Sequence, residues 1–235
     1  MISVCLATYN GEKYIKEQIE SILVQLNDND ELIVSDDNSS DKTVNIITGF
    51  LDSRIRLFIN IEKGYTSNFE NALKQAKGDI IFLSDQDDIW SHNKVAICSE
   101  YLKSCDLVVS DCIIIDENKN IIAESYYEER KPKKSCLGNL IKFGYLGACL
   151  AFRAEILEKA LPFPHKRLLC THDNWLFLVG ACYFNHKILY DKLILYRRHK
   201  NNFSSGGLSN STTTCFKIRY RIYLVFNILL RYLIK

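Results

Sequence analysis

Three carboxylates stand within four residues at 85–88, directly after an apolar run, and their types and spacing suit metal chemistry. The run 80–83 reads Ile-Ile-Phe-Leu, which predicts a buried strand with Asp85, Asp87 and Asp88 at its carboxyl end. Carboxylates this close repel one another unless a cation sits among them. Oxygen ligands on a short loop suit Mg²⁺ or Mn²⁺, above all an ion shared with substrate phosphates. We therefore predict a metal site rather than a solvated acidic turn, with Asp85 and Asp87 as ligands and Asp88 as a second ligand or a support for the loop.

Polar residues also follow the first two apolar runs of the chain. Thr8, Tyr9 and Asn10 come after the first run and leave room for a ligand above a strand. Asp37 follows the second run, where its carboxylate can accept the imide N–H of a uracil or thymine ring, a donor that adenine lacks. We therefore expect Asp37 to recognise a pyrimidine base and Asp41 to cap the next helix.

Two further polar clusters lie in the second half of the chain. His172 and Asp173 open an apolar helical segment, where the helix dipole stabilises the carboxylate. A helix cap and a general base that deprotonates an acceptor hydroxyl explain Asp173 equally well. After the last apolar run, Arg197 is suited to close over a diphosphate, and His199 to bind a metal or a phosphate. A solvated basic turn is the alternative for this second cluster.

The elements that must position these side chains alternate regularly in the first half. Strands are predicted at residues 3–7, 31–35, 55–60, 79–84 and 106–110, and helices at 12–25, 41–51, 67–76 and 93–104. This order predicts an α/β fold, with a mostly parallel sheet and helices on both faces. Ligands of such sheets bind at the carboxyl ends of strands, which is where the polar clusters lie.

The regular alternation of strands and helices ends after residue 111. Residues 113–122 read as a hairpin and 128–134 as a charged, solvated loop. Helices are then predicted at 136–143, 154–160 and 171–183, and strands at 148–153 and 187–196.

Composition excludes several classes of protein. The net charge is +2 at pH 7, so nothing favours a nucleic acid partner. The nine cysteines are odd in number and include no Cys-x-x-Cys pair, a pattern typical of reduced thiols in an intracellular protein rather than of a disulfide framework or a zinc site. The first residues lack the pattern of a signal peptide, and no apolar stretch is long enough to cross a bilayer. We therefore expect a cytoplasmic location.

The last segment of the chain differs from the rest. A linker at 204–209 precedes residues 216–235, which are aromatic, aliphatic and basic without any acidic residue. This pattern favours an amphipathic helix on the inner face of the cell membrane. A helix packed on the body of the protein, or a dimer contact, would have the same pattern.

Together these segments resemble the inverting family 2 glycosyltransferases, which have the GT-A fold. The resemblance rests on 7–11 (Ala-Thr-Tyr-Asn-Gly), 34–41 (Val-Ser-Asp-Asp-Asn-Ser-Ser-Asp), 77–90 (Lys-Gly-Asp-Ile-Ile-Phe-Leu-Ser-Asp-Gln-Asp-Asp-Ile-Trp) and 196–202 (Tyr-Arg-Arg-His-Lys-Asn-Asn). It implies a GT-A domain at 1–205, with a nucleotide-sugar half at 1–110 and an acceptor half at 111–205. Residues 206–235 would form the linker and the basic amphipathic tail.

The resemblance implies roles on the donor side of the site. Asp37 would bind the pyrimidine, with Thr8, Tyr9 and Asn10 around it. The pair formed by Asp85 and Asp87 would be the family's Asp-x-Asp motif, which touches the ribose and the metal.

On the acceptor side, Asp173 occupies the place of the family's catalytic base. The family usually has Glu-Asp there, whereas this chain has His172 before Asp173, which leaves His172 in a supporting role. Arg197 and His199 resemble the loop that closes on the diphosphate, with His199 as a further metal ligand.

The implied function is the Mn²⁺- or Mg²⁺-dependent transfer, with inversion, of one sugar from a UDP- or dTDP-sugar to a hydroxyl of a polyprenyl-diphosphate-linked saccharide. The Gln-x-x-Arg-Trp signature of processive synthases is missing from the sequence. The sequence of residues 84–90 is similar to the corresponding segment of bacterial enzymes that synthesise O-antigen, capsule or exopolysaccharide, including rhamnosyltransferases.

Other functions fit the sequence less well. A haloacid-dehalogenase-like phosphatase would carry Asp-x-Asp after its first strand, and a pyrophosphorylase a Gly-rich, Arg-containing loop there. A dehydrogenase would need Gly-x-Gly-x-x-Gly, which residues 7–13 do not supply. A nucleotide-sugar-binding protein without turnover is the non-enzymatic alternative, against which the acids at all three positions argue.

Overall fold

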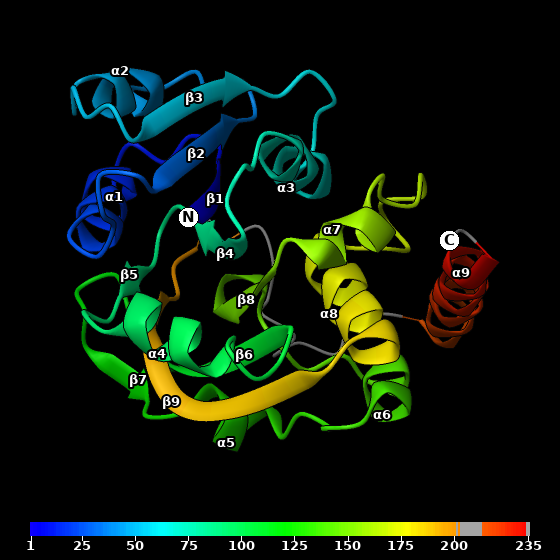
Figure 1. Ribbon diagram of the computed structural model, residues 1–235. Coiled ribbons are helices and arrows are strands. Elements are labelled where there is room, and N and C mark those ends of the chain that lie inside the picture. The colour runs from blue at the N-terminus through cyan, green and yellow to red at the C-terminus, as the bar shows by residue number, and fades with distance from the viewer. Residues whose placement is uncertain (201, 203–212, 234–235) are drawn as a thin grey trace.

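The computed structural model describes residues 1–200, 202 and 213–233 (Figure 1). Its strands form one nine-stranded sheet in the order β3-β2-β1-β4-β8-β6-β9-β5, with β7 paired to β6. The strands are β1 (Ile2–Thr8), β2 (Glu31–Asp36), β3 (Ile55–Ile59), β4 (Ile80–Asp85), β5 (Ile89–Trp90), β6 (Leu107–Ile115), β7 (Ile121–Ala123), β8 (Leu150–Arg153) and β9 (His186–Arg197).

The first four strands of this order are parallel, as the alternation of strands and helices predicts. The register sets Thr8 opposite Asp36 and Ala7 opposite Asp85, so the polar residues that follow β1, β2 and β4 meet at one edge of the sheet. Every residue of β2 is buried, because a central parallel strand is covered on both faces.

The rest of the sheet is mixed. β8 runs antiparallel to both β4 and β6, whereas β6 and β9 are parallel and β5 is antiparallel to β9. The α/β class is therefore confirmed, but parallel pairing is limited to the first four strands and to β6 with β9. The division expected at residue 110 falls inside β6. The β4–β8 pairing makes the two halves share one sheet.

Helices cover both faces of the sheet, as expected. They are α1 (Ile15–Leu23), α2 (Thr43–Thr48), α3 (Tyr65–Lys74), α4 (Lys94–Tyr101), α5 (Tyr126–Arg130), α6 (Cys136–Ile141), α7 (Glu155–Ala160), α8 (His172–Tyr183) and α9 (Thr214–Leu233), with a short 3₁₀ turn η1 (Gly147–Cys149). In Figure 1, α1 and α2 lie on one side of β1–β3 and α3 on the other. The apolar stripe Ile15, Ile19 and Ile22 of α1 is fully buried, with the spacing of one helix face.

Three local features differ from the expectations. The segment expected to be a charged loop begins inside α5, because Ser125 caps a short helix by accepting a hydrogen bond from the Glu128 N–H. The two-residue strand β5 has too short a pattern to be recognised in the sequence, and its pairing with β9 defines it. Asp41 does cap α2, but from two residues before the helix, through the Thr43 N–H at 2.9 Å.

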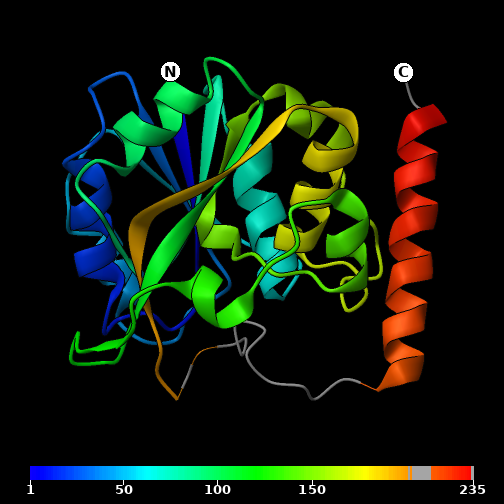
Figure 2. The ribbon, with the colours of Figure 1, turned by 90° about the horizontal axis from the view of Figure 1, so that it is seen from below.

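The terminal helix α9 lies along the edge of the body, beside α6 and α8 (Figure 2). Leu224 is fully buried there, and Tyr220 and Ile228 pack against the core on the same face. The described ranges contain no helix long and apolar enough to cross a membrane. The linker expected at 204–209 lies outside the described residues.

Candidate active site

The acidic loop after β4 meets the basic segment after β9. Oδ2 of Asp87 lies 2.8 Å from Nε2 of His199 and accepts a hydrogen bond from the Asn202 side-chain amide at 3.1 Å. His199 also stacks on Tyr14, with ring centroids 4.9 Å apart. The two predicted metal ligands, 112 residues apart in the chain, are therefore in direct contact.

Asp85 lies at the last position of β4 and is half-buried. Burial, together with the nearby charges of Asp87 and Asp173, raises its pKa to about 7. Among the described residues, no donor forms a hydrogen bond with its carboxylate. Asp85 therefore faces a space shared with both other acids, in which a cation would relieve the repulsion.

The donor atoms at this edge fit the expected metal. Carboxylate oxygens from Asp85 and Asp87 with the imidazole nitrogen of His199 form an O,O,N set that suits Mn²⁺, and the oxygens suit Mg²⁺. The described residues hold no group of three or more His, Cys, Asp or Glu side chains already arranged around one point.

Asp88 and Arg197 hold the two segments together. One carboxylate oxygen of Asp88 accepts the backbone N–H of Arg197 at 3.1 Å, and the other is buried without a hydrogen-bond partner among the described residues. Burial and the charges of Asp87 and Asp85 raise the pKa of Asp88 well above its usual range. Asp88 is thus buried and joins the acidic loop to the segment after β9.

The Arg197 side chain has a different position from the expected one. It is 1% exposed, and its guanidinium donates to the carbonyl oxygens of Asp87 and Glu117 and to the carboxylate of Glu17 at 2.8 Å. The guanidinium also lies over the Tyr14 ring. A side chain engaged in this way positions the loop, whereas its neighbours in the chain reach the surface.

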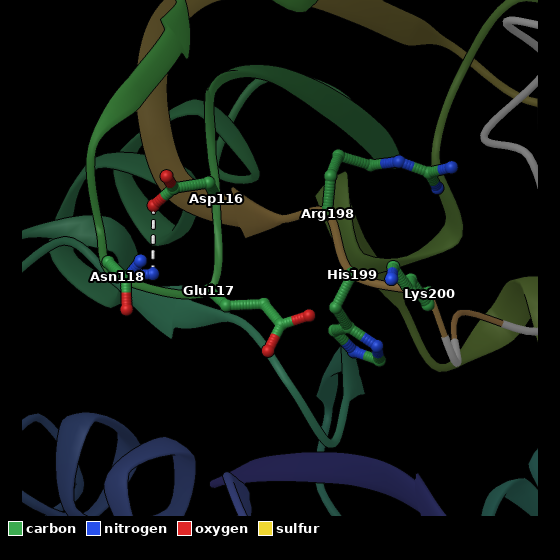
Figure 3. Close-up of a pocket in the computed structure, with 6 residues that line it drawn as sticks. All are labelled: Asp116, Glu117, Asn118, Arg198, His199 and Lys200. Carbon is green, nitrogen blue, oxygen red and sulfur yellow. Dashed lines mark hydrogen bonds between the residues drawn. The ribbon is translucent and has the colours of Figure 1, made fainter.

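Those neighbours line an open pocket of about 520 Å³ (Figure 3). Arg198, His199 and Lys200 form one side of it, and residues 116–118 form the other. Glu117 and His199 point toward each other across the pocket in Figure 3. The pocket adjoins Asp87 through His199, so it lies beside the acidic loop.

Asp37, the residue expected to recognise a base, directly follows β2. Its two carboxylate oxygens accept hydrogen bonds from the Asn60 side-chain amide at 2.8 Å and from the Gly64 N–H at 2.9 Å. Gly64 has a φ of 122°, a backbone conformation that side chains other than glycine rarely adopt. This contact orients the half-buried Asp37 carboxylate at the carboxyl end of β2.

Gln86 crosslinks the ends of β1 and β4, a role that the sequence analysis missed. Its side-chain oxygen accepts from the Thr8 hydroxyl at 2.6 Å and the Tyr9 N–H at 2.8 Å, while its amide donates to the Tyr9 carbonyl at 3.1 Å. A Cβ on Gly11 would lie 2.3 Å from this oxygen, so any larger residue there would displace the Gln86 side chain. The signal in the sequence that could have pointed to this role is the position of Gln86 in the middle of the Asp-x-Asp motif.

Asn10 forms hydrogen bonds with the loop that follows β2. Its φ of 49° is left-handed, its backbone N–H donates to the Ser39 hydroxyl, and its side-chain oxygen accepts from the Ser40 N–H at 2.8 Å. The Tyr9 side chain is exposed, and Thr8 is buried. The loops after β1 and β2 are thus joined around the expected base pocket.

Asp173 lies in the first turn of α8 and reaches the same edge from the acceptor half. It is half-buried, it accepts the Asn174 N–H at 2.7 Å, and its charge contributes to the raised pKa of Asp85. His172 points elsewhere and stacks on Phe69 at 3.9 Å. Burial lowers the pKa of His172 to about 4, so it is neutral at pH 7.

Comparison with known proteins identifies similar sequences. Residues 3–161 match the sequence model of glycosyl transferase family 2. WfgD of Escherichia coli, a UDP-Glc:alpha-D-GlcNAc-diphosphoundecaprenol beta-1,3-glucosyltransferase, is 34% identical over 171 residues, which cover 71% of this chain and 66% of WfgD. The dTDP-rhamnosyl transferase RfbG of Shigella flexneri is 30% identical over 92% of this chain and 77% of its own length. The chain thus spans about two thirds to three quarters of these relatives.

Solved structures share the fold at lower identity. S. aureus TarS 1–349 in complex with UDP-GlcNAc superposes with a TM-score of 0.75 at 19% identity, covering 97% of this chain and 66% of that one. The mannosyltransferase PcManGT of Pyrobaculum calidifontis, in complex with GDP-Man and Mn²⁺, superposes with a TM-score of 0.64 at 18% identity over 98% of this chain and 73% of its own.

Proposed function

This chain belongs to glycosyl transferase family 2, and on that premise we propose that it moves one sugar from a UDP- or dTDP-sugar to a saccharide hydroxyl, with inversion at the anomeric carbon. The observation that carries this proposal is the contact of Asp87 with His199 at 2.8 Å, which joins the acidic loop after β4 to the basic segment after β9. The charge of Asp173, the candidate base on the acceptor side, also contributes to the raised pKa of Asp85.

The proposed reaction is a single displacement. The acceptor oxygen forms a bond to the anomeric carbon while the bond from that carbon to the diphosphate oxygen breaks. Asp173 takes the proton of the acceptor hydroxyl as general base. Asp37 accepts the imide N–H of the pyrimidine, and Arg198 and Lys200 contact the diphosphate from the side of the open pocket. Attack from the face opposite the leaving group inverts the configuration.

Asp85, Asp87 and His199 are the residues that we assign to an Mn²⁺ or Mg²⁺ ion. When bound, such an ion neutralises the charge that develops on the departing nucleoside diphosphate. The support for this assignment is the contact of Asp87 with His199 at 2.8 Å and the position of Asp85 beside them.

The acceptor that we propose is linked to a polyprenyl diphosphate, in the synthesis of a bacterial surface polysaccharide. One relative, WfgD, is described as acting on a diphosphoundecaprenol-linked sugar, and another, RfbG, as a dTDP-rhamnosyl transferase. A lipid-linked acceptor requires the enzyme to work at a membrane. The outward face of α9 carries Ile218, Ile222 and Leu229, all exposed, and suits an anionic bilayer surface.

A panel of nucleotide-sugars tests this function. The full chain is incubated with each donor, with and without Mn²⁺, and with saccharide acceptors, while melting temperature and release of nucleoside diphosphate are measured. A donor at 100 times its Kd stabilises the native state by about 2.7 kcal/mol, which is a shift of several degrees. We expect a UDP- or dTDP-sugar to give both the shift and the release. A rise in melting temperature without release of nucleoside diphosphate under any condition would favour a nucleotide-sugar-binding protein without turnover.

Asp173→Asn separates binding from transfer. The variant should keep the donor-dependent shift and lose transfer by at least about 100-fold, because general bases contribute roughly 10²–10⁴-fold. Asp28→Asn is the matched control, since Asp28 is exposed in the turn before β2, at the opposite edge of the sheet, and its variant should transfer normally. Full transfer by Asp173→Asn would show that the base is another group.

A further inference from the structure

Two cysteines that are far apart in the sequence meet on the acceptor side of the molecule. Cys136 begins α6 and Cys182 lies near the end of α8, and their sulfur atoms are 2.7 Å apart. A disulfide bond holds two sulfur atoms about 2 Å apart, so the pair needs little movement to be joined. The odd number of cysteines and the lack of Cys-x-x-Cys gave no hint of this pair.

The pair is accessible, in contrast to most thiols of the chain. Cys182 is exposed and Cys136 is half-buried, whereas Cys5, Cys98, Cys105, Cys112, Cys149 and Cys170 are buried. Cys215 is exposed on α9 and makes no contact with another described thiol. An oxidant in solution therefore reaches the pair and Cys215 before the others.

Cys136 is the better nucleophile of the two. The hydrogen bond from Cys182 lowers the pKa of the Cys136 thiol to about 7, and the same contact raises the pKa of Cys182. A thiolate, rather than a thiol, attacks an oxidant. The geometry therefore supplies an attacking sulfur and a resolving sulfur side by side, which is the arrangement typical of oxidation-sensitive thiols.

We propose that Cys136 and Cys182 are a reversible oxidation site, which hydrogen peroxide converts to an intramolecular disulfide between α6 and α8. The Cys136 thiolate attacks one peroxide oxygen, the O–O bond breaks, and Cys136 becomes a sulfenic acid as one water is released. Cys182 then attacks the Cys136 sulfur, the S–O bond breaks, and the second water departs. Two thiols and one peroxide thus give one disulfide and two waters.

The bond would join two distant segments of the acceptor half. Between Cys136 and Cys182 the chain runs through η1, β8 and α7 into α8, and it includes Asp173. Closing a loop of this length restricts the unfolded chain and stabilises the native state. The disulfide would also hold α6 against the C-terminal end of the helix whose first turn carries Asp173.

Peptide mapping of the native full chain tests the site. The protein is treated with peroxide in small molar excess, its free thiols are alkylated, and it is digested without reductant. The tryptic peptide that carries Cys182 also carries Cys170, so a chymotrypsin digest, which cleaves after Trp175 and Phe177, separates the two. We expect a Cys136–Cys182 linked peptide that dithiothreitol removes, and a melting temperature about 5–10 °C higher in the oxidised protein.

Matched variants decide the outcome. Cys136→Ser and Cys182→Ser should each abolish the linked peptide and the rise in melting temperature, while Cys215→Ser should keep both. The proposal is overturned if Cys136 and Cys182 stay separately alkylated at doses that oxidise Cys215. It is equally overturned if the crosslinks formed are between two copies of the chain.

Discussion

His172 and Asp173 are neighbours in the chain but have different surroundings. Asp173 faces Asp85 at the sheet edge, whereas His172 is buried against Phe69 with its Nδ1 lacking a hydrogen-bond partner among the described residues. Burial keeps His172 neutral by lowering its pKa to about 4. The histidine that stands where the family usually has glutamate therefore adds no charge beside Asp173, and it contributes packing at the start of α8.

The buried His172 gives a pH dependence of stability whose sign is defined. Its pKa is about 4 when folded and about 6.5 when unfolded, so between these values only the unfolded chain binds the proton. The stabilisation is complete above pH 6.5 and falls as the pH drops, by up to roughly 3 kcal/mol near pH 4. Urea unfolding of the wild type and of His172→Phe between pH 4 and pH 8 measures it.

For each protein, the free energy of unfolding at each pH is compared with its own value at pH 8. This separates the effect of His172 titration from any change in packing that the substitution causes. His172→Phe should show the smaller loss on acidification. Asp85 acts in the opposite direction in both proteins, because its folded pKa of about 7 lies above the unfolded value and favours the native state as the pH falls. Curves of equal steepness for the two proteins would show that His172 binds its proton when folded.

At the scale of elements, the turn after β1 shows how closely the backbone approaches the site. A Cβ on Gly11 would meet the Gln86 side chain at 2.3 Å, so Gly11→Ala must displace the crosslink between Gln86 and Thr8. We expect a loss of about 1–3 kcal/mol in stability and weaker binding of UDP, measured by urea unfolding and calorimetry. Gly49→Ala at the end of α2 is the matched control, because its Cβ would stay at least 3.3 Å from its neighbours. Equal effects of the two substitutions would contradict the crosslink.

Two adjacent arginines at the end of β9 have different roles, because Arg197 is buried and Arg198 lines the open pocket. Arg197 ties β9 to the acidic loop and to α1, so Arg197→Met should lower the free energy of unfolding by about 2–4 kcal/mol, since several buried hydrogen bonds are lost. Arg198→Met should change stability by less than about 0.5 kcal/mol and raise the KM for the donor, because Arg198 lines the open pocket. Unfolding curves and initial rates measure the two effects. A larger loss of stability in Arg198→Met would reverse the assignment.

The sequence could predict the edge of the sheet at which the site lies, but not which side chains turn into it. Asp87 and His199 follow two apolar runs, and the rule that ligands lie at carboxyl ends of strands is enough to bring them together. Arg197 and Arg198 have the same chemistry, and only the register of β9 against β6 decides which one is buried. Gln86 was missed for a similar reason, because its partners Thr8 and Tyr9 lie at the end of another strand and directly after it.

Over the whole molecule, one sheet joins the two halves of the chain. β4 ends in Asp85 and pairs with β8, whose other neighbour is β6, so the proposed donor half and the proposed acceptor half share a continuous layer. The antiparallel β8 was not expected, because its apolar pattern does not reveal its direction. The helix α8 then packs against both α3 and β6 and brings Asp173 to the donor edge. The relative placement of the candidate base and the candidate donor site thus depends on the packed core and not on a flexible junction.

The helix α9 joins this body through one face and leaves the other uncovered. Tyr220, Leu224 and Ile228 face inward, while Ile222 and Leu229 are 65% and 61% exposed. Every charged residue of 213–233 is Lys or Arg. An exposed apolar stripe beside cations matches a bilayer of anionic lipids better than it matches water.

We therefore expect the full chain to sediment with vesicles of phosphatidylglycerol and phosphatidylcholine, and far less with phosphatidylcholine alone. Replacing both Ile222 and Leu229 by glutamate should abolish binding, because each change places an anion on the face that meets the lipid. Val24→Glu, at an exposed apolar position after α1, is the matched control and should bind as the wild type does. Arg219→Gln should weaken binding about fivefold, since one basic residue near the surface contributes about 1 kcal/mol. Equal binding to both kinds of vesicle, or a stable dimer that the double substitution dissolves, would assign this face to another partner.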